Sequence, residues 1–135
     1  MTRWQRILAI AAGLVVLAGL YALRPDHGPP REAFVASADA PLWSSTPNMS
    51  ATENAEHHWR KHGREFPQLH SAAEYEAAAH VFVSAPPPGT LVKHHRNGDT
   101  LFYDPARNTF AVRARNGAPR TMFEPDNGLR YWERQ

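Results

Sequence analysis

The longest apolar stretch of the chain lies near its N-terminus, where residues 7–23 read ILAIAAGLVVLAGLYAL without a charge. A helix of this composition has no polar face, so it is unsuited to the surface of a soluble domain. Arg3 and Arg6 precede the stretch. Basic residues in this position keep the N-terminus of a membrane segment in the cytoplasm. The pattern predicts a transmembrane or signal-anchor segment over residues 1–23, with residues 7–23 inside the membrane.

Cleavage after this segment would release the rest of the chain as a secreted protein. The small residues at 36–38 (Ala-Ser-Ala) suit a signal peptidase, but they lie far downstream of the apolar stretch. The closer Leu-Tyr-Ala at 20–22 has a large side chain where a small one is needed. We therefore favour an uncleaved anchor, with cleavage as the alternative, and expect the remaining chain on the far side of the membrane.

Residues 24–49 show neither helical nor strand periodicity. Their prolines and small residues predict a semi-extended linker. Regular patterns begin at residue 50, so we expect one small α+β domain over residues 50–135.

Two capping boxes predict two helices at the start of this domain. In each box a serine accepts a backbone N–H bond, and the glutamate three residues later reaches back. Residues 50–53 open a helix that is expected to run to about His62, where Gly63 suits the left-handed position past a helix end. Residues 71–74 open an alanine-rich helix that ends before the prolines at 86–88. Its apolar positions recur at helical spacing and are expected to face the core: Tyr75, Ala78, Ala79 and Phe82.

Beyond residue 89 the pattern changes to short apolar and β-branched runs separated by turn sequences. Asn-Gly pairs, which tolerate positive φ, mark the tight turns. The candidate strands are residues 90–95, 100–103, 108–115 and 120–124, with a last run at 129–133. The expected fold class is therefore α+β, with two helices followed by a four- or five-stranded antiparallel sheet. We expect the helices to cover one face of the sheet and leave the other open.

Composition excludes several kinds of chemistry. The chain has no cysteine, which excludes a thiol enzyme, a thiolate metal site and disulfides. The formal net charge is +2, and four of the basic residues precede residue 50, so the domain itself is close to neutral. Net charge therefore gives no argument for nucleic-acid binding, which would have to come from local clusters.

The densest polar cluster is HHWRKHGREF at residues 57–66. On a helix, His58 and His62 share a face that Lys61 borders, and Glu65 adds a carboxylate nearby. Imidazole titrates near neutral pH and can act as base and then as acid, while a cation stabilises charge on a phosphoryl group. A solvated basic helix face is the alternative reading of this cluster, and it is the commoner one for such a segment in isolation.

A zinc site is a further alternative, because two histidines four residues apart on a helix can hold zinc. The residues between them are Trp59, Arg60 and Lys61. The glutamate of the metalloprotease motif is thus absent, and two cations would repel a divalent ion. We therefore expect no metal ligands and no cofactor.

A second cluster lies on the predicted sheet. In a regular strand, Arg113 and Arg115 point to the same face, and we expect them to form a basic patch on the open side. Arg120 and Thr121 supply a cation and a hydroxyl on the next strand. Tyr131 offers an aromatic surface on which a nucleobase can stack. Taken singly, each of these features is better explained by surface arginines and core aromatics.

Taken together, the motifs resemble the nuclease domains at the C-terminal tips of bacterial polymorphic and contact-dependent inhibition toxins. Those domains are grouped with barnase, EndoU, colicin and RelE-like ribonucleases. The resemblance covers nearly the whole predicted domain. The matching residues are His58, Lys61, His62, Gly63, Glu65, Phe66, Tyr75, Asn97 to Asp99, Tyr103 to Pro105, Asn108, Phe110 to Val112, Arg120, Thr121, Phe123, Tyr131 and Trp132.

The resemblance implies metal-independent cleavage of RNA, in which the 2′-hydroxyl attacks its own phosphate. The implied catalytic residues are His58, His62, Arg120 and Thr121. The expected substrate-binding residues are Lys61, Glu65 and Tyr131, together with the basic patch of Arg113 and Arg115. Which histidine is the base and which the acid stays open.

The expected partners are an RNA substrate and the membrane, and the resemblance also allows an immunity protein. We expect a monomer whose domain lies outside the cytoplasm, held at a bacterial inner membrane or secreted. The membrane segment and the near-neutral domain depart from the usual form of these toxins. They keep open the alternative of a non-catalytic extracytoplasmic binding module with the same fold.

Overall fold

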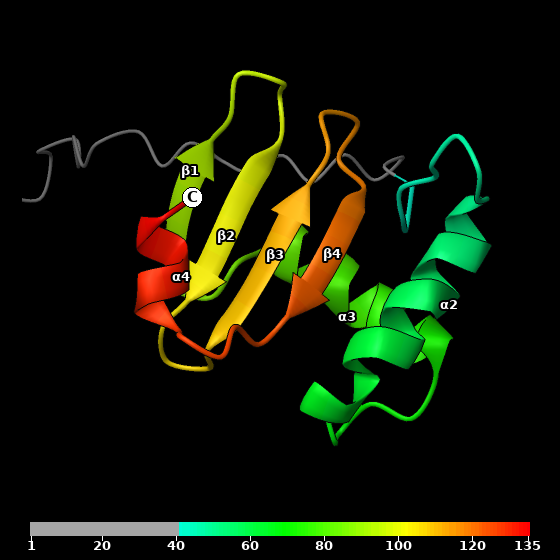
Figure 1. Cartoon of the computed structure of the whole chain (residues 1–135), viewed down its shortest axis with the longest axis horizontal. Coiled ribbons are helices and arrows are strands. Elements are labelled where there is room, and N and C mark those ends of the chain that lie inside the picture. The colour runs from blue at the N-terminus through cyan, green and yellow to red at the C-terminus, as the bar shows by residue number, and fades with distance from the viewer. Residues whose placement is uncertain (1–40) are drawn as a thin grey trace, which may run out of the picture. The chain divides into compact units, whose positions relative to one another are not determined.

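A computed structural model describes residues 41–135 (Figure 1). The predicted membrane segment at 1–23 and most of the predicted linker lie outside the described residues. Within residues 41–135, no helix is both long and apolar enough to cross a membrane. The described part is α+β, with two helices followed by a four-stranded antiparallel sheet, as the sequence predicts.

The sheet is a simple meander in the order β1-β2-β3-β4. Each strand therefore pairs with its neighbour in the sequence, and the Asn-Gly pairs lie in the β1–β2 and β3–β4 turns as predicted. The elements in chain order are α2 (Ala51–His62), η1 (Gly63–Glu65), α3 (Ala72–Ser84), β1 (Leu91–His94), β2 (Thr100–Asp104), β3 (Thr109–Arg113), β4 (Pro119–Phe123) and α4 (Leu129–Glu133).

Both predicted capping serines begin helices. Ser50 accepts the backbone N–H of Glu53, and the Glu53 carboxylate accepts the Ser50 N–H at 2.8 Å, which completes the capping box of α2. Ser71 likewise accepts the N–H of Glu74. The Glu74 carboxylate reaches one residue further and accepts the N–H of His70 at 2.8 Å. The N-termini of both helices are thus fixed by local side chains.

α2 ends at His62 as predicted, but the conformation of Gly63 differs from the prediction. Gly63 has a right-handed conformation (φ −58°, ψ −28°), because the chain continues directly into the 3-10 helix η1. A Cβ atom at this position would lie 2.5 Å from the Trp59 ring. Glycine is therefore required here by the close approach of an indole and not by a left-handed φ.

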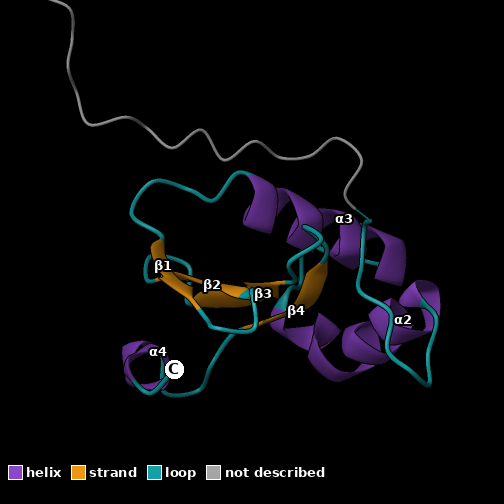
Figure 2. Ribbon diagram, turned by 90° about the horizontal axis from the view of Figure 1, so that it is seen from above, coloured by secondary structure: helices purple, strands orange, loops and turns teal. Residues whose placement is uncertain are grey.

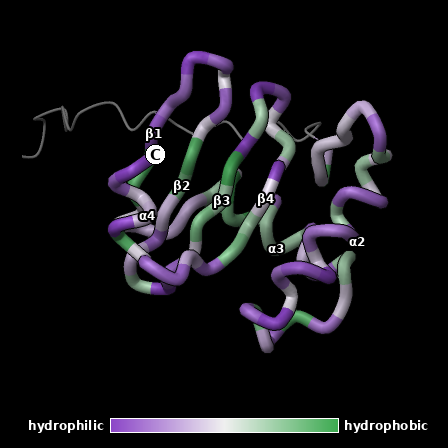
Figure 3. Tube along the Cα trace, viewed as in Figure 1, coloured by the Kyte–Doolittle hydropathy of each residue, from purple (hydrophilic) through white to green (hydrophobic). Residues whose placement is uncertain are grey.

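The main core lies between α3 and the sheet, with α2 beside β4 (Figure 2). Figure 3 shows hydrophobic residues gathered along β2 and β3, whereas much of α2 is hydrophilic. Tyr75 of α3 is fully buried; its hydroxyl donates to the Met122 carbonyl and accepts the Met122 N–H. Ala79 and Phe82 are buried as predicted, and Ala78 packs against the same core.

The packed domain begins before the predicted boundary at residue 50. Trp43 is only 1% exposed and belongs to the main core. The Ser44 N–H donates to the Pro119 carbonyl at 2.8 Å, and the Asn54 side chain donates to the Ser44 carbonyl at 2.8 Å. The end of the predicted linker is therefore an entry segment bound to β4 and α2.

The second face of the sheet is not fully open, contrary to the prediction. Residues 129–133 form the short helix α4 rather than a fifth strand, and α4 lies across this face (Figure 2). The Trp132 ring stacks on Tyr103 with 6.1 Å between ring centroids, and both pack with Leu101 and Phe110. The Lys93 ammonium donates to the Trp132 carbonyl at 2.8 Å and ties α4 to β1.

Candidate functional site

The spacing of residues in α2 and η1 places three polar side chains on one face. His58, His62 and Glu65 are separated by four and three residues, which aligns them along the helix. One residue further on, Trp59, Gly63 and Phe66 follow the same spacing and pack toward the core. All three polar side chains are only partly exposed. We call His58, His62 and Glu65 the site face of α2.

Glu65 and His62 form a carboxylate–imidazole pair, with 2.9 Å between Glu65 Oε1 and His62 Nδ1. The other carboxylate oxygen, Oε2, accepts the Glu124 N–H at 2.7 Å. Both oxygens of Glu65 are thus engaged, which fixes the carboxylate against β4. A carboxylate at Nδ1 keeps a proton on that nitrogen and leaves Nε2 as the reactive position.

His62 is held from its other side by an aromatic ring. Its imidazole stacks on Phe123 of β4, with 5.2 Å between centroids and 23° between planes. The His62 side chain is only 13% exposed. Position and orientation of this imidazole are therefore set by both a hydrogen bond and a packing contact.

His58 sits one turn earlier, between β4 and the entry segment. Its Nδ1 lies 3.3 Å from the Thr121 hydroxyl, and its ring centroid is 5.5 Å from that of Trp43. Burial, together with the positive charge of His62, His57 and Lys61, lowers the pKa of His58 to about 4. His58 is therefore neutral at neutral pH.

The two imidazoles stack on each other, with 6.0 Å between centroids and 24° between planes. The structure therefore brings together three of the four predicted catalytic residues, His58, His62 and Thr121, and adds Glu65 to them. One imidazole is neutral and half-buried, while the other is paired with a carboxylate. Two histidines in such different surroundings are suited to different proton-transfer roles.

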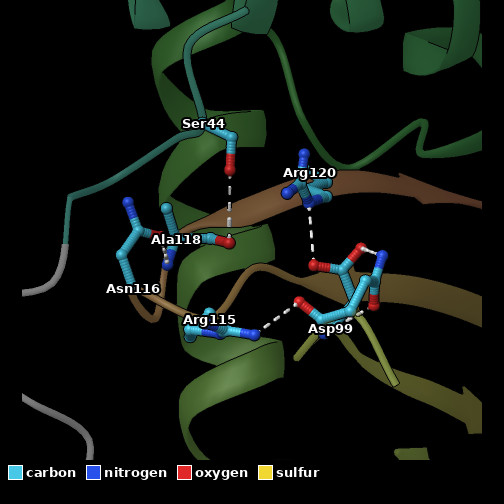
Figure 4. A network of polar contacts seen from close by, with 7 residues as sticks. Ser44, Asp99, Arg115, Asn116, Ala118 and Arg120 are labelled. Atoms are coloured by element: carbon cyan, nitrogen blue, oxygen red, sulfur yellow. Dashed lines mark hydrogen bonds and ion pairs between the residues drawn. The ribbon is translucent and has the colours of Figure 1, made fainter. Parts of the chain in front are cut away.

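The fourth predicted catalytic residue, Arg120, is engaged elsewhere. Its Nε donates to Asp99 Oδ1 at 3.0 Å, which links β4 to the β1–β2 turn (Figure 4). Among residues 41–135, this carboxylate is the only hydrogen-bond partner of the Arg120 side chain. The Arg120 side chain is 49% exposed, so its Nη groups remain accessible.

The prediction of a basic patch on the open face of the sheet is wrong. Arg113 lies on the face covered by α3, where its guanidinium donates to the Val83 carbonyl at 3.0 Å and lies over the Phe102 ring. Arg115 lies beyond the end of β3 and donates to the Asn97 carbonyl at 3.2 Å. Arg113 shares its face with Ala111, as strand alternation predicts, but this is the face that α3 covers and not the open one. A register shift at Val112/Arg113 ends the regular pairing before Arg115.

A cavity of about 280 Å³ opens beside the carboxylate–imidazole pair. The predicted stacking residue Tyr131 forms one wall and packs edge-on against Phe123 and Phe110, at 5.5 and 5.1 Å between centroids. The loop between β4 and α4 forms the other side. The lining residues are His62, Glu65, Phe123, Glu124, Pro125, Asp126, Asn127 and Tyr131. We call this space the loop cavity.

Several residues of the site carry no signal in the sequence that would single them out. Trp43 lies in a segment without periodicity, so no local pattern places it against His58. Glu124 ends a predicted strand, and Asp126 and Asn127 have the pattern of ordinary turn residues; only the fold brings them next to His62. Phe123 is among the residues that carry the family resemblance. Its alternation with Met122 along the strand indicates that it faces away from the main core.

Within the part of the chain that the structure describes, no group of three or more potential metal-ligating side chains is assembled. No protein-family model matches this sequence, and no curated protein matches it. The arguments for function therefore come from the geometry of the site.

Proposed function

We propose that this protein is a ribonuclease-like enzyme that cleaves RNA without a metal, by general acid–base catalysis with two histidines. The observation that carries the proposal is the stacked pair of His58, which is neutral, and His62, which is paired with Glu65. Cleavage by the 2′-hydroxyl requires one group that accepts a proton and one that donates a proton, and this pair offers both.

His58 is the proposed base. With Nδ1–H donating to the Thr121 hydroxyl, its Nε2 lone pair is available to take the proton of the 2′-hydroxyl. The 2′ oxygen then attacks the adjacent phosphorus. A base that is already neutral needs no prior deprotonation, which favours His58 over its neighbour in this role.

His62 is the proposed acid. Its Nδ1 contacts the Glu65 carboxylate, which the backbone N–H of Glu124 holds in place, so Nε2 is the nitrogen that faces the substrate in this proposal. As the bond from phosphorus to the 5′ oxygen breaks, Nε2 donates a proton to that oxygen. The products are a 2′,3′-cyclic phosphate and a free 5′-hydroxyl; His58 has gained one proton and His62 has lost one.

Cations near the pair would stabilise the charge that develops on the phosphoryl oxygens. Lys61 is exposed and close enough for its charge to lower the pKa of His58. Arg120 is held by Asp99 through Nε, which leaves its Nη groups for a phosphate. We assign both to phosphate binding. Arg113 is left out of this assignment because its guanidinium lies on the opposite face of the sheet.

The test uses the full-length protein in detergent, incubated with single-stranded RNA and a chelator. We expect cleavage by the wild type and its loss in His58→Ala and His62→Ala. His95→Ala is the matched control, because His95 is exposed in the β1–β2 turn, away from α2. A wild type that leaves RNA intact would overturn the proposal, as would histidine variants that cleave as fast as the control.

A second candidate function is a binding module with the same fold and no turnover. The acidic groups near the pair favour it, since Asp99 neutralises Arg120 and Glu124 and Asp126 line the loop cavity. Anions in these positions weaken attraction for RNA phosphates. A wild type that is folded by circular dichroism but forms no product from RNA in the same assay would support this function over the first.

We also propose that residues 1–23 hold the domain outside the cytoplasm of a bacterial cell, or direct its secretion. The uncharged stretch at 7–23 and the arginines before it support this placement. We further propose that the enzyme is a monomer and that an immunity protein binds it. Protease accessibility of the domain in intact spheroplasts tests its location, since a domain in the cytoplasm would be protected.

A further inference from the structure

The loop cavity lies directly beside His62 and differs in charge from the rest of the site. Glu124 and Asp126 both line it, as does the amide of Asn127. Among residues 41–135, the carboxylates of Glu124 and Asp126 take part in no hydrogen bond or ion pair. These acidic side chains are therefore available to a ligand.

The walls of the loop cavity suit a flat ring. The imidazole of His62, the ring of Phe123 and the phenol of Tyr131 border it from α2, β4 and α4. Nucleobases stack on aromatic surfaces of this kind, whichever base is present. At about 280 Å³ the cavity admits a single base and not a folded RNA element.

The carboxylates determine which chemical groups can enter. An ionised carboxylate only accepts hydrogen bonds, and it repels other anions. The cavity is thus unfavourable for a phosphate and favourable for an amino group. Adenine, cytosine and guanine each carry an exocyclic amino group, whereas the pairing edge of uracil has one N–H between two carbonyl oxygens. Those oxygens would face the carboxylates.

The phosphates have a different place to bind. Three basic residues are exposed on α2 and η1: His57, Lys61 and Arg64. Each immediately precedes a residue of the site face, so the three align in a stripe parallel to it. This basic stripe borders the site face, and His62 and Glu65 of the site face also line the loop cavity. A strand that crosses the site face can place its backbone on the stripe and one base in the cavity.

We propose that the loop cavity is a nucleobase subsite that selects a base with an exocyclic amino group over uracil. Glu124 and Asp126 are the residues that determine this specificity, and Tyr131 is the stacking wall. The proposal rests on the proposed function, since it names the part of the RNA that lies beside His62.

The test measures binding and needs no cleavage. Full-length protein in detergent is titrated with 2′-O-methyl dinucleotides, which lack the attacking hydroxyl, with each of the four bases placed at each position in turn. At one position, dinucleotides with adenine, cytosine or guanine should bind about tenfold more tightly than those with uracil. In Glu124→Gln/Asp126→Asn, this ratio should fall close to one.

Both substitutions keep the size of the side chain, and Glu124 contacts Glu65 through its backbone N–H, which a glutamine retains. Glu133→Gln is the matched control, because it removes an exposed carboxylate of α4 that does not line the cavity. An unchanged circular dichroism spectrum and melting temperature verify the fold. Should the double variant unfold, Asp126→Asn alone is measured, since Asp126 is exposed and its side chain has no partner in the described chain.

Equal binding of uracil and the other bases would overturn the subsite, as would a ratio that the double variant leaves unchanged. The two proposals fail separately. Selective binding by a wild type that cleaves no RNA would retain the subsite and remove the nuclease. Cleavage without any base preference in binding would retain the nuclease and remove the subsite.

Discussion

The hydroxyl of Thr121 lies 3.3 Å from Nδ1 of His58, although 63 residues separate them in the sequence. This contact joins the first helix of the domain to the last strand of its sheet. It also fixes which ring nitrogen of His58 points toward solvent. The contact therefore depends on the whole domain being folded, and it is the clearest target for a substitution.

Removing that hydroxyl should weaken the proposed base. Thr121→Val keeps the shape of the side chain but leaves His58 Nδ1 without its partner. Because the lost hydrogen bond is to an imidazole that becomes charged during the reaction, we expect kcat to fall about tenfold or more, with little change in KM. Steady-state kinetics on a short RNA measures this. Thr52→Val, on the exposed side of the first turn of α2, is the control; equal rates for the two variants would contradict the role of Thr121.

The proposed acid can be tested by changing the leaving group. A 4-nitrophenyl ester of cytidine 3′-phosphate loses a phenolate that needs no proton, so its cleavage bypasses the acid and still requires the base. Glu65→Gln and His62→Ala should be impaired strongly on RNA and only weakly on this ester, whereas His58→Ala should be impaired on both. Release of nitrophenolate is followed by absorbance. If His58→Ala were the variant rescued by the ester, the two histidines would have to exchange roles.

The lowered pKa of His58 predicts an acid limb at unusually low pH. Since the base must be neutral, activity should be lost as the pH falls through about 4, and not near the ordinary histidine value. Lys61→Gln removes one of the positive charges that lower this pKa, so its limb should move to higher pH. A histidine NMR titration reports the same shift without any substrate. A His58 resonance that titrates at the ordinary value in both proteins would contradict the assignment.

The entry segment should contribute strongly to stability. Trp43 is buried against Tyr75 and His58, with 5.4 and 5.5 Å between ring centroids. Trp43→Ala leaves a large cavity there, and we expect the free energy of unfolding to fall by about 3–5 kcal/mol. Urea denaturation measures it. Leu42→Ala is the control, because its side chain is 54% exposed; similar losses for both variants would contradict the packing role of Trp43.

Much of the fold follows from local signals, and the departures from prediction occur where distant contacts decide. Ser50 and Ser71 cap helices because the required partners lie within four residues. The short run at 129–133 has no such signal, since a few apolar residues fit a helix or a strand, and packing of Trp132 on Tyr103 decides for the helix. The left-handed φ predicted for Gly63 is wrong, because the Trp59 ring and not the backbone conformation requires a glycine there.

The site is predictable to the extent that one helix determines it. The four-residue spacing of His58 and His62 is enough to align them on one face of α2. The partners on β4 depend on strand register, which the motif around Thr121 indicates correctly. Strand alternation correctly groups Arg113 with Ala111, but it does not tell which face of the sheet the helices cover. Trp43 and Asp126 reach the site only through the tertiary fold, and no periodicity in the sequence reports that.

The position of Trp43 determines where a protease can cleave the chain without disturbing the surroundings of His58. Its indole packs against the His58 imidazole. The backbone N–H of the next residue, Ser44, donates a hydrogen bond to the carbonyl of Pro119, the first residue of β4. A protease that released the domain at residues 36–38 would leave the Trp43 indole in the domain. A cut only a few residues later, between Trp43 and the start of α2, would produce a fragment with every proposed catalytic side chain but an exposed His58. We therefore expect that cleavage compatible with an intact His58 environment occurs only before Trp43.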